Sequence, residues 1–419
     1  MHSNRKAVIS WALYDCANSV FALSVVSAFF PLLFRQYWNG GGDGAISTLR
    51  LGVANSAASV AVALLAPVLG AAADRGSAKL RYLAAFAALA VVMTALLALV
   101  PLGGWRMALA LFVVASIGFA AANIFYDALI VDVAQGEHLH YVSALGFGLG
   151  YLGGGLLLAC NVAMMAWPRQ FGLVDSIQAV RVSFVLVAAW WIVFAIPLLL
   201  SVREAPGRQH HSSQSALKEG LRELAATWRQ LRNRRSIWLF LLAYWLYIDG
   251  VYTIARMGID YGLALGFDAN HLIAALLIAQ FVGFPAALAF GYAGERLGAK
   301  PAIFAALAIY TGATVWGYFM TGSLDFYLLA VAIGLAQGGV QSLSRSFYAR
   351  LIPCAQSGAF FGLYNMAGRF AAVLGPLLMG GIGVFTGNPR LPILSLLPLL
   401  IVGALLLSQI QEPGKADSP

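Results

Sequence analysis

The sequence has little charge. Only 10% of its 419 residues are Asp, Glu, Lys or Arg, whereas soluble domains average about 25%. Hydrophobic residues make up 61% of the chain, which excludes an ordinary soluble domain. The composition therefore indicates a polytopic helical membrane protein. A spanning helix needs roughly 20 apolar residues, so a chain of this length has room for about a dozen with short loops.

Cysteine and catalytic motifs are also scarce. Cys16, Cys160 and Cys354 lie in or beside predicted helices without metal-ligand spacing, so we expect core residues, no disulfide framework and no metal site. The sequence has no G-x4-G-K-(S/T) loop for ATP and no HExxH or GxSxG motif of an enzyme. The glycine run at 146–155 lies in an apolar segment with no preceding strand, which excludes a dinucleotide site and favours close helix packing. We predict no cofactor and no enzymatic activity.

Apolar runs between charge clusters and Gly or Pro breaks predict twelve spanning helices. We place them at 8–34, 47–73, 80–101, 106–134, 140–165, 180–202, 236–264, 270–294, 299–321, 324–350, 357–386 and 390–410.

The distribution of Lys and Arg predicts the orientation, because these residues resist translocation across the membrane. By this map, 18 of the 26 basic residues fall on one side, so both termini are predicted to be cytoplasmic. Topology and contact with phospholipid explain the net charge of +9, and no nucleic acid partner is needed. The first apolar run is too long for a cleavable signal and indicates a signal anchor.

One long polar segment, 203–235, separates two predicted domains at 1–202 and 236–419. Its first part is typical of a flexible linker. Residues 217–231 have leucines at helical spacing and bases on the other face, which predicts a helix along the inner membrane surface. His210 and His211 could bind a metal, but a solvated linker pair is the favoured interpretation.

Two repeated motifs indicate an internal duplication. Gly70-Ala-Ala-Ala-Asp74-Arg75 ends the second predicted helix, and Gly291-Tyr-Ala-Gly-Glu295-Arg296 ends the eighth. Trp11-Ala-Leu-Tyr-Asp15 in the first helix is matched by Trp245-Leu-Tyr-Ile-Asp249 in the seventh. The predicted fold class is therefore an all-α membrane protein with 12 transmembrane helices in two pseudo-symmetric six-helix bundles. In such folds the substrate site lies near the midplane between the bundles.

The repeated Gly-x3-acid-Arg motif predicts a gate, because charges at the membrane surface can hold a loop against its neighbours in one conformation. Its spacing resembles the signature loop of the major facilitator superfamily, which lies between helices 2 and 3 and again between helices 8 and 9. Arg345 lies close to the inner end of its helix, where we expect it to pack against Glu295. The predicted gating residues are Gly70, Asp74, Arg75, Gly291, Glu295, Arg296 and Arg345.

Polar residues inside the predicted helices mark a candidate site for substrate or coupling ion. A charge at the centre of a helix costs about 2.5 kcal/mol or more, so exposure of these residues to lipid is not expected. They lie on helices 1, 4, 7, 10 and 11, and are Asp15, Asn18, Asn123, Asp127, Asp249, Arg256, Gln337, Gln341, Asn365 and Arg369.

Two interpretations of these charges remain open. In the functional one, an Asp couples a proton or binds a substrate amine, and Arg256 or Arg369 receives a carboxylate through its two-pronged donor geometry. In the structural one, the charges form ion pairs between helices or extend to the aqueous end. Arg256, for example, could pair with Asp260 four residues later.

A narrower resemblance covers both halves. Trp11-Ala-Leu-Tyr-Asp15-Cys-Ala-Asn18, Phe125-Tyr126-Asp127 and Ser344-Arg345-Ser346-Phe-Tyr-Ala-Arg350-Leu-Ile-Pro353 resemble the vacuolar effluxer-like branch of the major facilitator superfamily, as do Phe361-Gly362 and Gly375-Pro376. Fungal members of this branch resemble exporters of amino acids from the vacuole, so the resemblance implies a transport function. Cys16 stands where the branch usually has Trp, and Val131-Asp132 replaces a common Pro-His, so no substrate is carried over. The short termini fit a bacterial inner-membrane member.

The predicted function is secondary transport by alternating access. The two motif loops stabilise the outward-facing state, and a carboxylate among Asp15, Asp127 and Asp249 couples a proton to export of a small polar or zwitterionic, amino-acid-like metabolite. Expected partners are this small molecule, protons and the lipid bilayer, and the protein is expected to be a monomer. The alternatives are a non-transporting membrane sensor or scaffold, and a carrier of a larger amphiphilic or lipid-like cargo.

Overall fold

The computed structural model describes residues 5–39, 44–74, 78–134, 138–204, 234–371 and 373–411. Every regular element in these ranges is helical, and 12 helices are long and apolar enough to cross a membrane. The predicted linker helix, with His210 and His211, lies outside the described residues, as does Arg75.

Six spans come from the first half of the chain. The first is formed by α1 (Arg5–Val20), the π-helix η1 (Phe21–Phe29) and α2 (Phe30–Leu33), and is continued by η2 (Phe34–Trp38). The others are α3 (Gly44–Ala73), α4 (Lys79–Leu97), α5 (Trp105–Ala128) with α6 (Ile130–Val133), α7 (Leu139–Ala166) and α8 (Ser176–Ser201).

Six spans come from the second half. They are α10 (Arg235–Ala264), α11 (Ala269–Leu297), α12 (Ala299–Phe319), α13 (Ser323–Leu351), the broken pair α14 (Ser357–Phe370) and α15 (Leu374–Thr386), and the pair α16 (Leu391–Leu394) and α17 (Leu397–Ser408). The twelve predicted helices are confirmed, and most of their ends agree within a few residues. The third span ends at Leu97 rather than 101, because the chain turns through Pro101 and Gly103, whose φ is 75°.

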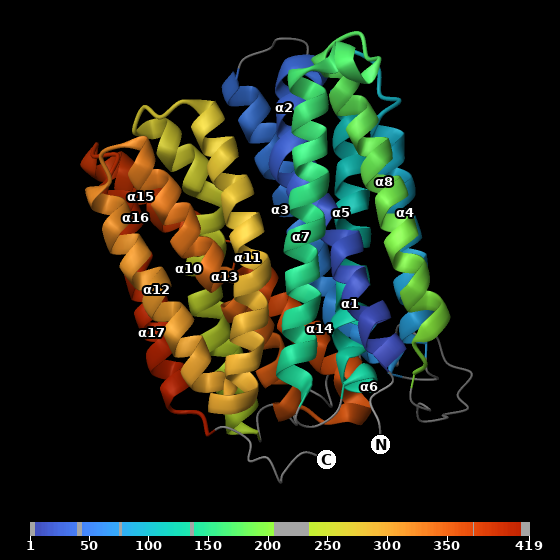
Figure 1. The fold of residues 1–419 in the computed structure, drawn as a ribbon, viewed down its shortest axis with the longest axis vertical. Coiled ribbons are helices and arrows are strands. Elements are labelled where there is room, and N and C mark those ends of the chain that lie inside the picture. Colours follow the sequence, from blue (N-terminus) through green and yellow to red (C-terminus); the bar gives the residue numbers. More distant parts are fainter. Residues whose placement is uncertain are drawn as a thin grey trace.

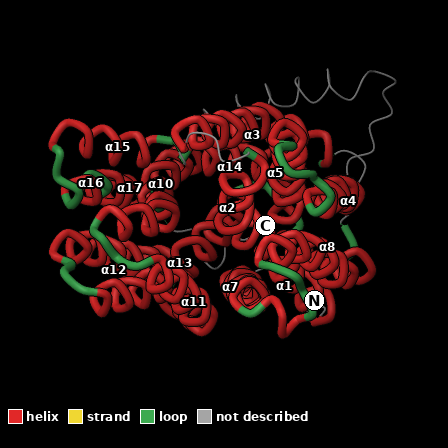
Figure 2. Tube along the Cα trace, turned by 90° about the horizontal axis from the view of Figure 1, so that it is seen from above, coloured by secondary structure: helices red, strands yellow, loops and turns green. Residues whose placement is uncertain are grey.

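The two sets of six helices stand side by side, and α1 begins and α17 ends at the same end of the molecule (Figure 1). Seen along the helices, the two sets lie on either side of a common centre (Figure 2). The halves meet mainly where α7 packs on α11 and α3 packs on α14. These pairs are the fifth span with the eighth and the second with the eleventh, which are equivalent under the duplication. The two-bundle fold predicted from the repeated motifs is therefore confirmed.

Glycines on α7 let its neighbours approach on two sides. A Cβ at Gly150 would lie 2.6 Å from Ser19 Oγ of α1, and one at Gly153 would collide with Cys16 Sγ. On the other side, a Cβ at Gly155 would lie 3.1 Å from Gln280 Cβ of α11. The packing role predicted for this glycine run is confirmed, and it places α1 and α11 directly against α7.

Candidate functional site

A cavity of about 800 Å³ lies between the two halves. Its floor is formed by Asp15, Asp127 and Arg345, which lie nearer the end of their spans that carries the chain termini. From there it extends to residues at the far ends of the helices, including Pro31 and Phe326. This volume suits a small organic molecule. The cavity therefore belongs to the side of the molecule opposite the termini.

Nine of the ten predicted substrate and coupling residues line this cavity. They are Asp15, Asn18, Asn123, Asp127, Arg256, Gln337, Gln341, Asn365 and Arg369. Ser19, Ser116 and Arg345 also line it. The tenth predicted residue, Asp249, is not among the lining residues.

Arg345 forms the floor of the cavity by joining the two halves. Its side chain comes from α13, is 2% exposed, and places Nη2 at 3.2 Å from Asp15 Oδ2 and Nη1 at 3.1 Å from Asp127 Oδ1. Its Nε donates to Ser143 Oγ at 3.0 Å, and Nη2 also donates to the Ser143 carbonyl at 2.9 Å. The expectation that Arg345 packs against Glu295 is wrong, because two buried carboxylates of the first half surround the guanidinium instead.

The two carboxylates have further partners. The Tyr126 hydroxyl donates to Asp15 Oδ2 at 2.8 Å, and Asn365 Nδ2 donates to Asp127 Oδ2 at 3.0 Å. Asn365 lies on α14, so a second residue of the second half donates a hydrogen bond to the first half at this point. Buried carboxylates need such donors because an unpaired buried charge is costly. The cluster is therefore a satisfied network that spans the interface between the bundles.

Gly146 on α7 leaves room for this network. A Cβ at this position would lie 2.6 Å from Asp15 Oδ2 and 3.1 Å from Arg345 Nη2. The sequence interpretation assigned Gly146 only to helix packing and did not include Ser143. The only sequence signal that the two residues act together is their spacing, because Ser143 lies three residues before Gly146, on the same face of a helix.

The two predicted gate acids each cap a helix of the opposite half. Asp74, at the end of α3, accepts hydrogen bonds at 2.8 Å from the backbone N–H groups of Gly358 and Ala359 at the start of α14. Glu295, near the end of α11, accepts one at 2.9 Å from Tyr141 N at the start of α7. Carboxylates stabilise helix N-termini because the first N–H groups there have no partner within the helix.

The repeated spacing of Gly and acid in the two motifs is explained by close contact between helices of the two halves. The backbone of Gly70 packs directly on that of Gly358, and a Cβ at Gly291 would collide with Ala144 of α7. Arg296 lies with its guanidinium 4.5 Å from the centre of the Tyr292 ring. The acids and glycines of both motifs thus connect the halves at the end that carries the termini.

Other contacts at this end were not predicted. Lys79 Nζ lies 2.9 Å from Asp132 Oδ2 and donates to Ser357 Oγ of α14 at 2.8 Å. In the equivalent place, His140 Nδ1 and Ser346 Oγ of α13 lie 2.8 Å apart. Short polar residues such as Ser357 and Ser346 carry no sequence signal for a partner hundreds of residues away.

Asp249 stabilises the break in the eleventh span. It is 1% exposed, and both of its carboxylate oxygens lie 3.0 Å from Gly375 N in the first turn of α15. The Thr253 hydroxyl donates to the same carboxylate at 3.3 Å. The eleventh span is interrupted just before Gly375-Pro376, since α14 ends at Phe370 and α15 begins at Leu374.

Arg256 and Arg369 line the cavity on the side of the second half. Neither makes a hydrogen bond or ion pair within the part of the chain that the structure describes. Arg256 lies 6.0 Å from the centre of the Tyr252 ring, and Arg369 lies 6.0 Å from that of Phe119. The side chain of Asp260, the alternative partner of Arg256, is outside the described side chains.

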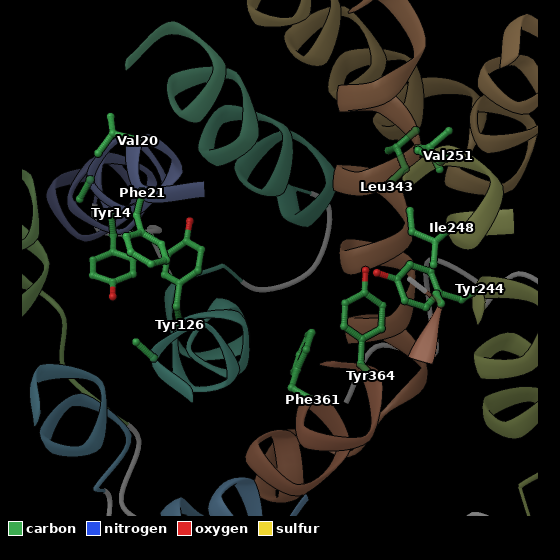
Figure 3. Packing of buried hydrophobic residues seen from close by; sticks show 14 of the residues in the cluster. Tyr14, Val20, Phe21, Tyr126, Tyr244, Ile248, Val251, Leu343, Phe361 and Tyr364 are labelled. Carbon is green, nitrogen blue, oxygen red and sulfur yellow. The ribbon is translucent and has the colours of Figure 1, made fainter. Parts of the chain in front are cut away.

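Aromatic side chains form much of the cavity wall. Tyr244 and Tyr364 stack with ring centres 4.3 Å apart, and Figure 3 shows their hydroxyl groups close together. On the other side of the same view, Tyr126 lies beside Tyr14 and Phe21 (Figure 3). Among the described residues, no three His, Cys, Asp or Glu side chains come together as metal ligands. The site is therefore a cavity with an aromatic lining and a few charged groups.

Comparison with known proteins shows which family this chain resembles. The sequence pattern of the family described as "Vacuole effluxer Atg22 like" matches residues 51–417. An uncharacterised MFS-type transporter, YxiO of Bacillus subtilis, is 36% identical over 411 residues, covering 97% of this chain and 95% of that protein. Autophagy-related protein 22-1 of Aspergillus niger is 27% identical over 301 residues, which are 66% of this chain but only 48% of the fungal protein.

Solved structures support the fold alone. The proton:xylose symporter XylE of the major facilitator superfamily superposes with a TM-score of 0.73, covering 98% of this chain and 96% of that one, at 13% sequence identity. At this identity the likeness extends to the arrangement of helices and not to the residues of the site.

Proposed function

The chain belongs to the Atg22-like effluxer family and is a transporter of the major facilitator superfamily, not an enzyme; from this premise we propose proton-coupled export of a small polar, amino-acid-like metabolite. Transport proceeds by alternating access, in which the two bundles rock about the central cavity. We further propose that the protein is a monomer in the inner membrane of a bacterium, with both termini in the cytoplasm.

The distribution of basic residues supports this orientation, since Arg5, Lys6, Lys79, Arg81, Arg296, Lys300 and Arg350 lie at the helix ends on the side of the termini. In this orientation the cavity faces outward, and the contacts of Asp74, Glu295, Lys79 and Arg345 form the closed cytoplasmic gate. Opening toward the cytoplasm requires α11, α13 and α14 to separate from the first half at this end, so all of these contacts must break.

The observation that carries the proposal is the ion cluster of Arg345 with Asp15 and Asp127. It joins the halves and lines the cavity. An ion pair with a structural role alone could equally lie in the protein core, away from the cavity. A cluster that both lines the cavity and closes the gate connects occupancy of the site with the conformation of the carrier.

Proton coupling follows from the charges of this cluster. A proton that enters through the outward-facing cavity neutralises one carboxylate and removes one partner of Arg345. Breaking one partner of a buried ion pair costs about 3–5 kcal/mol, because the remaining charge loses its compensation. The protonated cluster therefore holds the gate less tightly, and the carrier turns inward. The proton then leaves to the cytoplasm, and Arg345 rebinds the carboxylates once substrate has been carried outward.

The direction of coupling is fixed by this order of events. The proton moves inward on the same half-cycle that returns the empty cavity to the cytoplasm, so the outward half-cycle carries substrate. The result is exchange of an external proton for an internal metabolite. Asp15 and Asp127 take the coupling role in this scheme, while Asp249 holds the break between α14 and α15.

Counterflow in liposomes tests the proposal. Purified protein is reconstituted into vesicles preloaded with one unlabelled amino acid, and accumulation of the same labelled amino acid is measured with and without a pH gradient. We expect counterflow that a gradient accelerates, and loss of the gradient effect in Asp127→Asn. The exposed Asp268 provides a matched control, Asp268→Asn, outside the cavity lining. Stabilisation of the protein by an amino acid without any flux would instead identify a sensor.

A further inference from the structure

The charges of the cavity do not balance. The carboxylates among the described lining residues are Asp15 and Asp127, and both are bound by Arg345. Two more cations, Arg256 and Arg369, line the same cavity. Asp249 offers them no compensation by hydrogen bonding, since its oxygens bind Gly375 N and the Thr253 hydroxyl. With three guanidinium groups and two carboxylates, the described part of the lining carries an excess of positive charge.

Arg256 and Arg369 have no hydrogen-bonded acid among the described residues. Neither forms a hydrogen bond or ion pair with the described residues, and both line the same cavity. Ionisable groups within the membrane are expensive and usually pair with one another or face a water-filled path. Arg256 lies on α10 and Arg369 near the end of α14, so each of two helices places a positive charge in the cavity lining.

We propose that Arg256 and Arg369 bind the acidic group of an organic anion, so that the substrate carries more negative than positive charge. A guanidinium presents donors in a planar fork that matches a carboxylate or phosphate. Tyr252 and Phe119, which lie beside the two guanidinium groups, provide apolar surface for the body of the molecule. This inference rests on the proposed transport function and narrows its substrate class.

A zwitterion fits the cavity less well. Its ammonium group would need a carboxylate, and those of Asp15 and Asp127 already accept hydrogen bonds from Arg345, Tyr126 and Asn365. A molecule whose amine is acylated, or outweighed by a second acid, avoids this competition. The preferred substrate is therefore an acidic derivative rather than a neutral amino acid.

Four related compounds test the charge preference with little change of shape. They are N-acetylphenylalanine, which is an anion, N-acetylphenylalaninamide, which is uncharged, phenylalanine, which is a zwitterion, and phenylalaninamide, which is a cation. Each is added at millimolar concentration to the purified protein, and the shift of the thermal unfolding midpoint is measured, since a ligand of the folded state raises it. We expect N-acetylphenylalanine to stabilise most and phenylalaninamide least.

Variants connect this preference to the two arginines. Arg256→Gln and Arg369→Gln should bind N-acetylphenylalanine about 10-fold to 100-fold more weakly, because a hydrogen-bonded charge pair is lost. Arg369→Lys, which keeps the charge without the fork, should lie between them and the wild type. Arg106→Gln removes a positive charge from an exposed position outside the cavity lining and should bind as the wild type does. Without ligand, both cavity variants should be at least as stable as wild type, because they remove an uncompensated charge.

Three results would overturn the inference: equal or greater stabilisation by phenylalanine, no stabilisation by N-acetylphenylalanine, or unchanged binding in both Arg→Gln variants. Counterflow of phenylalanine in liposomes together with any of these would leave the proposed transport function intact. Binding of the anion without counterflow of any compound would do the reverse, since it would support the anion site and contradict the carrier.

Discussion

Arg345 donates a hydrogen bond to Asp15 at 3.2 Å although 330 residues separate them in the chain. Asp15 lies on α1 of the first half and Arg345 on α13 of the second, both nearer the end of the molecule that carries the termini, so the contact joins the two halves there. Because the same guanidinium also binds Asp127, its position reports the state of the gate.

Removing this cation should destabilise the closed form strongly. Arg345→Gln leaves two buried carboxylates without their main partner, at a cost of about 3–5 kcal/mol. The midpoint of thermal unfolding of the purified protein should fall accordingly. Combining it with Asp15→Asn and Asp127→Asn removes the uncompensated charges and should restore part of the loss. A triple variant as unstable as Arg345→Gln alone would show that shape, rather than charge, dominates at the cluster.

Gly146 and Gly148 lie two residues apart on α7 but have different surroundings, so they test the packing of the cluster. Gly146→Ala places a methyl group 2.6 Å from Asp15 Oδ2, so the cluster must shift, at about 1–3 kcal/mol. Gly148→Ala meets nothing closer than Phe284 at 3.4 Å, an ordinary contact. Thermal unfolding and transport should therefore be impaired in the first variant and nearly unchanged in the second. Equal effects would contradict the close fit at Gly146.

The helix caps of the gate should set the balance between outward and inward states. Asp74→Ala removes the acceptor for two N–H groups of α14 and should cost the closed gate about 1 kcal/mol, whereas Asp74→Asn keeps one acceptor oxygen and should cost less. Spin labels are attached at Arg81 and Ala355 in a variant that lacks the natural exposed cysteines. The distance between the labels, measured by electron paramagnetic resonance, reports the separation of α4 from the start of α14.

The expected result is a second, longer distance in Asp74→Ala that is weaker in Asp74→Asn. Glu295→Ala should have the same effect through α7, because its carboxylate caps Tyr141 N in the equivalent position. A distance distribution identical to that of the wild type in both Ala variants would remove the caps from the gate.

The helices could be predicted because their signal is local. A spanning segment needs only enough consecutive apolar residues, and the repeated Gly-x3-acid-Arg motif marked the duplication. The polar residues were chosen from the cost of burying charge in a spanning helix, and nine of the ten line the cavity.

The partners of the charges could not be predicted in the same way. Arg345 meets Asp127 rather than Glu295 because α13 crosses α7 at Ser143 and Gly146, and no pattern along one helix specifies that crossing. The position of Asp249 depends on where the eleventh span breaks. Pro376 marks the region, but the pairing of Asp249 with Gly375 N arises only when α10 and α15 pack together.

The coupling scheme makes different demands on Asp127 and Asp249, and their Asn variants separate the two roles. In Asp127→Asn the carboxylate that takes the proton is lost, so exchange between equal pools of substrate should persist while acceleration by a pH gradient disappears. In Asp249→Asn the amide oxygen can still accept from Gly375 N, so the gradient effect should remain, with a loss of stability of about 1 kcal/mol from the weaker cap. Proteoliposome flux with and without the gradient, measured beside thermal unfolding, gives both quantities. If Asp249→Asn abolished the gradient effect and Asp127→Asn retained it, the proton would be carried at the helix break, and the Arg345 cluster would be a structural gate alone.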